Sequence, residues 1–160
     1  VDQLGEAVSD ALSFDDAVII EQWIDGVEVT VPVLGSGWDA YALPPVEIVA
    51  KEGFCDTVAC RTPGAVELFA PVRPASLSND EADAQAIRAE IERAALEVCR
   101  AYQVRDLARV DLVWDGAQAR VLEVDVLPSL AESSPFSLAC EASGLSLSGV
   151  LNELVSQYAR

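Results

Sequence analysis

Hydrophobic and polar positions alternate with a period of two in several parts of the chain, which is typical of half-buried strands. The clearest case is 27–34, where Val29, Val31 and Val33 alternate with other residue types. A second apolar strand is predicted over 17–23, and the Asp25-Gly26 turn would join it to 27–34 as a hairpin. A third is predicted over 41–49, where Pro44-Pro45 indicates an edge strand.

Helical spacing of apolar residues marks four other segments. A short helix is predicted over 2–12, and a long one begins at Ser78–Glu81, interpreted as a capping box. Its buried stripe would consist of Ile87, Ile91, Ala94, Ala95, Val98 and Tyr102. Two more helices are expected over 136–142, ended by Gly144, and around Val150–Tyr158. Before the long helix, a long loop with a strand fragment at 66–69 is predicted over 51–77. The whole predicts an α+β fold, an antiparallel sheet with helices packed on it.

One predicted hairpin carries acids inside apolar strands. Its strands, 108–114 and 121–127, are joined by an Asp115-Gly116 turn. Because strand side chains alternate, Arg109 shares a face with Asp111, and Glu123 shares one with Asp125. The turn would bring Asp111 near Glu123, although the spacing leaves the register open.

Three carboxylates at one place need a compensating cation, and Mg²⁺ or Mn²⁺ would supply it while leaving room for phosphates. Arg109 on the same face could stabilise a developing negative charge. The alternative is an exposed hairpin whose acids face water. The apolar content of both strands and the clustering of the acids at one end, beside the Pro128-Ser129 turn, argue against it.

Composition narrows the chemistry further. The 160 residues carry a formal net charge of −17, which argues against a nucleic-acid partner. No apolar run approaches the roughly 20 residues that a membrane span needs, so no membrane partner is expected. The absence of histidine excludes Ser-His and Cys-His catalysis within the chain and leaves oxygen or sulfur as metal ligands. The chain opens without Met in mid-pattern, so we expect a fragment of a longer protein.

The four cysteines show no CxxC spacing, which makes a zinc site improbable on sequence grounds. Cys99 and Cys140 are predicted core residues, whereas Cys55 and Cys60 flank a loop and could pair. Reduced thiols are favoured over a disulfide framework.

Seven segments, taken in order, resemble D-alanine–D-alanine ligases of the ATP-grasp superfamily, specifically their C-terminal catalytic part. The family shows R-x-D, a hairpin, then L-E-x-N-x-x-P-G-M and a Ser-containing loop before a helix. The matching segments here are 20–29, 43–51, 53–56, 74–75, 109–111, 122–130 and 133–136. The resemblance implies that residues 1–160 are an ATP-grasp C-terminal fragment. The N-terminal substrate domain and the phosphate loop would lie outside this chain.

The resemblance also implies a role for individual residues. Asp111 and Glu123 would hold Mg²⁺, with Asp125 where the family has Asn, and Arg109 and Ser129 would stabilise the tetrahedral intermediate. Ser134 would bind the carboxylate of the second D-alanine. The residues expected around ATP are Glu21, Trp23, Ile24, Glu28, Phe54 and Leu122. The implied reaction is ATP-dependent ligation of two D-alanines through an acyl phosphate, for peptidoglycan precursors. The implied enzyme is cytoplasmic, and a homodimer is one assembly that the resemblance suggests.

Three departures indicate a divergent member of that family. Cys60 aligns with a lysine that contacts ATP phosphate, and Arg61 with the following tyrosine. Asp125 replaces Asn and Ser129 replaces Gly. These changes keep two alternatives open: a ligase for another amino acid or peptide, and an inactive relative that binds nucleotide or merely a partner.

Overall fold

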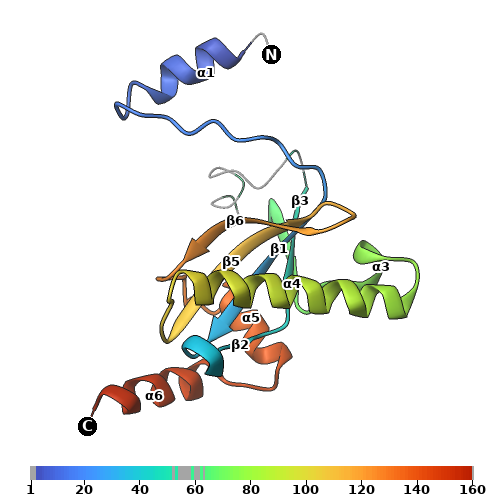
Figure 1. Cartoon of the computed structure of the whole chain (residues 1–160), viewed down its shortest axis with the longest axis vertical. Helices are drawn as coiled ribbons and strands as arrows, with labels where there is room; N and C mark the ends of the chain where they lie inside the picture. Colours follow the sequence, from blue (N-terminus) through green and yellow to red (C-terminus); the bar gives the residue numbers. More distant parts are fainter. Residues whose placement is uncertain (1–2, 52, 54–58, 60–61, 63, 160) are drawn as a thin grey trace.

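A single antiparallel sheet forms the centre of the computed structural model, which describes residues 3–51, 53, 59, 62 and 64–159 (Figure 1). Its strands are β1 (Val27–Leu34), β2 (Tyr41–Ala42), β3 (Val46–Ala50), β4 (Val66–Phe69), β5 (Leu107–Trp114) and β6 (Ala119–Asp125). They are ordered β4-β3-β1-β5-β6, and β2 pairs with β1. The predicted antiparallel α+β architecture is confirmed.

Helices pack on both faces of the sheet. The long helix α4 (Glu81–Ala101) lies along one face, where its Ile91 and Ala95 pack against Val110 and Leu112 of β5 (Figure 1). A second core lies on the opposite face, where α5 (Pro135–Ala142) and α6 (Leu147–Tyr158) cover part of the sheet. Phe136 of α5 is fully buried there. The remaining elements are α1 (Leu4–Ala11), the 3₁₀ turn η1 (Gly37–Asp39) and α3 (Pro74–Leu77).

The central strand β1 contains a proline, which a strand paired on both sides normally excludes. Pro32 is tolerated because one side of β1 is shared by two partners. β3 pairs with Val29 and Thr30, and β2 pairs with Val33 and Leu34. Pro32 therefore falls between these ladders, and its carbonyl still accepts a hydrogen bond from the Leu43 N–H at 2.8 Å.

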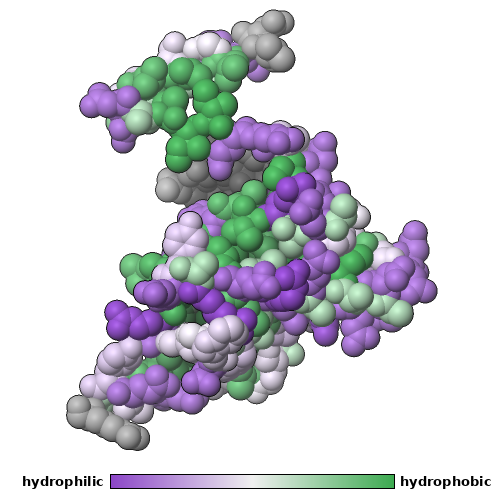
Figure 2. Space-filling model, in the orientation of Figure 1, coloured by the Kyte–Doolittle hydropathy of each residue, from purple (hydrophilic) through white to green (hydrophobic). Residues whose placement is uncertain are grey.

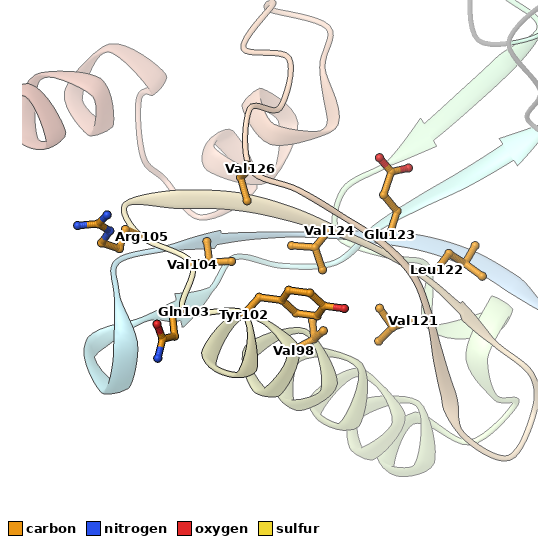
Figure 3. A pocket seen from close by; sticks show the side chains of 10 residues that line it. All are labelled: Val98, Tyr102, Gln103, Val104, Arg105, Val121, Leu122, Glu123, Val124 and Val126. Carbon is orange, nitrogen blue, oxygen red and sulfur yellow. The ribbon is translucent and has the colours of Figure 1, made fainter. Parts of the chain in front are cut away.

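A β-bulge divides β6 into two parts. Asp111 lies opposite Glu123, but the next residue of β5, Leu112, lies opposite Val121. Leu122 is therefore the extra residue of the bulge. Val121 faces the side of α4 and Glu123 faces away from it, although they are two residues apart (Figure 3).

The start of α4 differs from the prediction. Asp80, not Ser78, is the N-cap, since its carboxylate accepts from the N–H groups of Ala82 and Asp83 at 2.9 and 3.0 Å. Ser78 instead accepts from the Asp80 N–H. At the other end, Tyr102 is mostly exposed, so its place in the buried stripe was wrong. Cys99, one turn away on α4, is buried instead, as Cys140 is on α5; both thiols are core residues as predicted.

The strand predicted over 17–23, and with it the Asp25-Gly26 hairpin, is wrong. In the described chain this segment pairs with no strand, and Ile19 and Ile20 are largely exposed. Apolar composition alone is insufficient, because a strand needs a neighbour for its backbone groups. The predicted edge position of 41–49 is also wrong, because β3 lies between β1 and β4. The two prolines end up between β2 and β3, outside both ladders.

Residues 3–23 carry apolar side chains that the rest of the described chain does not cover. Helix α1 stands apart from the sheet, and hydrophobic residues gather over it (Figures 1 and 2). The exposed large residues there are Leu4, Leu12, Phe14, Ile19, Ile20 and Trp23. No helix among the described residues has the length and apolar character needed to cross a membrane.

Candidate functional site

The charged residues of the hairpin share one face of the sheet. Asp111 pairs across the ladder with Glu123, and Arg109 with Asp125. Directly opposed residues of antiparallel strands project to the same side. Their neighbours Val110 and Leu112 belong to the core beneath α4. The four charged residues therefore lie on the opposite face, as the sequence predicted.

Arg109 forms a bidentate ion pair with Asp111. Its Nε lies 2.9 Å from Asp111 Oδ1, and its Nη2 lies 2.9 Å from Oδ2. Nη2 is also 3.6 Å from Asp125 Oδ2. The other Asp125 oxygen, Oδ1, accepts from the Leu127 N–H at 2.9 Å. The Arg109 guanidinium thus partly neutralises two of the three clustered carboxylates, those of Asp111 and Asp125.

Asp111 has a second partner that the sequence did not single out. The Thr30 hydroxyl of β1 donates to Asp111 Oδ1 at 2.5 Å, and Thr30 is fully buried. The two residues are directly opposed in the β1–β5 ladder. The only sequence signal was one hydroxyl among the valines of 27–33, too common a pattern to indicate a site.

The carboxylates beside Arg109 are the candidate ligands for a divalent cation. Within the described ranges, no group of three or more acidic or cysteine residues is placed to hold a metal ion. The predicted convergence of three carboxylates is therefore absent there, because Asp125 is directed to Arg109 and the Leu127 amide. Asp111 and Glu123 remain opposed on one face. Two carboxylates fit Mg²⁺, which binds through one or two of them together with substrate phosphates.

Glu28 adds a further carboxylate beside this cluster. It lies on β1, two residues before Thr30 and therefore on the same face. Burial raises the pKa of Glu28, and the negative charge of Asp111 raises it further. The Glu28 carboxyl group is therefore less readily ionised than an exposed glutamate.

The other residues expected around ATP are less well assembled. Glu21 and Trp23 are exposed in the extended segment before β1, where Trp23 Nε1 donates to Asp25 Oδ1 at 2.7 Å. Ile24 is half-buried next to them. Phe54 lies outside the described residues, as do Cys55, Cys60 and Arg61. Their predicted roles remain predictions.

Leu122 lies at the border of a groove on the α4 side of the hairpin. This groove, of about 700 Å³, lies between the end of α4 and β6, and Val98, Tyr102, Val121 and Val124 point into it (Figure 3). The Glu123 carboxylate points away from the groove (Figure 3). The groove and the charged cluster are thus on opposite sides of β6.

Ser134 has a structural role at the start of α5, and its predicted contact with a substrate carboxylate remains a prediction. It is the buried N-cap of α5, where its Oγ accepts from the Ser137 N–H at 3.2 Å. The Ser137 hydroxyl donates to the Ala131 carbonyl at 2.7 Å, so in the Ser134–Ser137 contact of 3.1 Å the Ser134 hydroxyl is the donor. Ser134 would have to redirect that proton to bind a carboxylate. Ser129 is exposed in the loop between β6 and α5.

An ion pair between a buried carboxylate and a half-exposed guanidinium lies on the α4 face of the sheet, at β3. Glu47 of β3 accepts from Arg73 Nε at 2.9 Å and Nη2 at 2.7 Å, and from the Ser76 hydroxyl at 2.7 Å. Burial acts to raise the pKa of Glu47, but these hydrogen bonds outweigh it and lower the pKa. The pair ties β3 to the start of α3.

Comparison with known proteins places these features in a family. A family model described as "D-ala D-ala ligase C-terminus" matches residues 1–156. The D-alanine–D-alanine ligase of Carboxydothermus hydrogenoformans is 33% identical over 159 residues, covering 96% of this chain and 46% of that protein. That of Bordetella petrii is 34% identical over 155 residues, covering 96% and 45%. The chain thus spans about half the length of these relatives.

Solved structures agree. The VanG D-Ala:D-Ser ligase from Enterococcus faecalis superposes with a TM-score of 0.78 at 26% identity, covering 99% of this chain and 44% of that one. The Bacillus anthracis D-alanine–D-alanine ligase complexed with ATP gives a TM-score of 0.73 at 24% identity, covering 98% and 47%. The predicted ATP-grasp fold is confirmed. The match over nearly the whole chain and the shared architecture together show that the chain belongs to the D-alanine–D-alanine ligase family, as its C-terminal part.

Proposed function

We propose that this chain is the nucleotide- and metal-binding part of a longer ATP-dependent D-alanine–D-alanine ligase. The observation that carries the proposal is the cross-strand pair of Asp111 and Glu123, with Arg109 beside it, on the sheet face opposite α4. The family match supports ATP and D-alanine as the substrates of this site. As a consumer of ATP that makes peptidoglycan precursors, the full-length enzyme is expected in the cytoplasm, with a homodimer as one assembly to test.

The reaction would proceed in two steps. A D-alanine carboxylate attacks the γ-phosphorus of ATP, giving an acyl phosphate and ADP. The amine of a second D-alanine then attacks the acyl carbon, and phosphate leaves with the C–O bonding electrons. The products are the dipeptide, ADP and phosphate.

Each residue has a role in keeping with its surroundings. Asp111 and Glu123 would hold Mg²⁺, which would neutralise phosphate charge; Asp125 would join them only by leaving Arg109. Arg109, whose guanidinium is already fixed by Asp111, would stabilise the oxyanion together with the Ser129 N–H.

The substrate contacts follow from the same arrangement. Glu28 would accept from the ribose hydroxyls. Ser134 would donate to the carboxylate of the second D-alanine. The adenine ring would contact the remaining predicted residues, Glu21, Trp23, Ile24, Phe54 and Leu122.

The test is ADP release by the full-length protein with ATP, Mg²⁺ and D-alanine. We expect D-alanine-dependent ADP formation, and an otherwise folded Glu123→Gln variant to lose it. Glu97→Gln is a matched control, because Glu97 is an exposed carboxylate on α4 that pairs with Arg93 of the same helix. Retained turnover in Glu123→Gln would refute the metal assignment. Absence of a thermal shift with Mg²⁺ and ATP would favour an inactive relative.

A second substrate pair deserves the same assay. The superposition with a D-Ala:D-Ser ligase favours testing D-serine as the second amino acid. Asp125 and Ser129, where the chain departs from the family pattern, are compatible with a changed substrate. ADP release with D-alanine plus D-serine, but not with D-alanine alone, would support this alternative over the first.

A further inference from the structure

The hydroxyl of Thr30 is directed entirely at one carboxylate. Thr30 is in the middle of β1, opposite Asp111 on one side and Val46 on the other. It is fully buried, and its Oγ1 lies 2.5 Å from Asp111 Oδ1. A β-branched side chain in a strand has a restricted χ1, so the direction of this hydroxyl is fixed by the sheet itself.

Hydrogen-bond counting shows what this contact does to Asp111. A carboxylate oxygen offers about two lone-pair directions. Oδ1 receives two donors, the Thr30 hydroxyl and Arg109 Nε. Oδ2 receives one, Arg109 Nη2. Among the described residues, Oδ2 therefore has one lone-pair direction without a donor. The Asp111 side chain as a whole is about one-fifth exposed.

We infer that Thr30 is a positioning residue for Asp111: its hydroxyl occupies Oδ1 and so leaves Oδ2 to meet a divalent cation. The inference rests on the proposed function, in which Asp111 is a metal ligand. Outer partners that orient a ligating carboxylate typically change metal affinity or activity by about 10–100-fold when removed. The Thr30 hydroxyl is such a partner, supplied by the neighbouring strand.

Two substitutions separate the effect of the Thr30 hydroxyl from the effect of the side-chain volume. Thr30→Val keeps the β-branched volume and removes the donor, whereas Thr30→Ser keeps the donor. Ser76→Ala is a matched control: the Ser76 hydroxyl also donates to a carboxylate, that of Glu47, at 2.7 Å, but on the α4 face of the sheet. If the Thr30 hydroxyl had a structural role alone, all three variants would change the free energy of unfolding and leave metal binding unchanged.

The experiment measures metal binding directly and independently of turnover. Mn²⁺ is titrated into the full-length protein with ADP and followed by electron paramagnetic resonance, and the Mg²⁺ concentration for half-maximal ADP release is measured in parallel. We expect Thr30→Val to weaken both by about tenfold. Thr30→Ser should stay within about threefold of wild type, and Ser76→Ala should leave both unchanged.

Equal Mn²⁺ affinities for wild type and Thr30→Val would overturn the inference. The two proposals fail in different ways. A wild-type protein that binds Mn²⁺ and ADP but releases no ADP with any D-amino acid refutes the ligase function, and the Mn²⁺ comparison still decides the role of Thr30. A wild-type protein that binds no Mn²⁺ with ADP refutes both.

Discussion

Removal of Arg73 should destabilise the protein because it leaves the Glu47 carboxylate buried without its cation. The Glu47 side chain is 4% exposed, and Arg73 supplies three of its four hydrogen bonds, two from the guanidinium and one from the backbone. Arg73→Met removes the two guanidinium bonds but keeps an apolar stem against the Phe69 ring, over which the guanidinium lies at 3.9 Å.

The magnitude follows from the exposure of the two partners. Breaking a buried ion pair by removing one partner costs about 3–5 kcal/mol. Because the Arg73 side chain is 46% exposed, water can replace part of the hydrogen bonding that the guanidinium supplies to Glu47. The hydrogen bonds from the Ser76 hydroxyl and the residue-73 N–H also remain. We therefore expect a loss of about 2–3 kcal/mol. For a domain of this size that corresponds to a fall in Tm of about 4–12 °C.

The pH dependence provides a sharper check than the size of the loss. In the wild type the pKa of Glu47 is lowered, so its contribution to stability is complete above its ordinary value of 4.5 and is lost as the pH falls below it. Without the guanidinium, burial dominates and the pKa rises above 4.5. In Arg73→Met the contribution of Glu47 should therefore decline as the pH rises from 4.5 towards neutrality.

Urea unfolding of the full-length protein between pH 4 and pH 7 measures both effects. Glu47→Gln placed on Arg73→Met should recover much of the loss at pH 7, because a neutral amide replaces the unpaired charge. An Arg73→Met variant that loses less than about 1 kcal/mol, or that keeps the wild-type pH slope, would refute the reasoning.

Three further outcomes are expected. Gly26→Ala should cost about 1–3 kcal/mol in urea unfolding, because a Cβ would collide with the Trp114 carbonyl; a neutral result would refute that close packing. Cys99 and Cys140 should resist a thiol reagent in the native protein, since both are buried and burial raises the pKa of each thiol; rapid labelling in mass spectrometry would contradict this. Asp125→Asn should change stability by less than about 1 kcal/mol, because its contact with the neighbouring guanidinium is long and partly exposed; a larger change would assign it a structural role.

The alternating pattern predicted the charged hairpin well. The bounds of β1 agree with 27–34, and Asp111 lies opposite Glu123 as expected. Local alternation determines which side chains share a face, so the common face of Arg109 and Asp111 is accessible from sequence. The register and the bulge at Leu122 are not, because the spacing of the two strands allows more than one pairing.

Features that depend on distant neighbours could not be predicted. The segment 17–23 has the composition of a strand but no partner in the described chain. The importance of Thr30 depends on its being opposite Asp111, 81 residues away in sequence. The Glu47–Arg73 pair joins a strand to a loop across 26 residues. In each case the decisive interaction is non-local, and the residues themselves are of common types.

The bulge at Leu122 has a consequence for how the hairpin can vary. In an uninterrupted strand Val121, Glu123 and Asp125 would all project to one side. The extra residue reverses the alternation between Val121 and Glu123, so a core-facing half and a charged half coexist in one strand. Deleting Leu122 would make Val121 and Glu123 consecutive partners of Leu112 and Asp111 in a regular ladder, so Val121 would still face α4 and Glu123 would still face away from it. The residue count of this hairpin can therefore change by one at the bulge without exchanging its core-facing and charged sides.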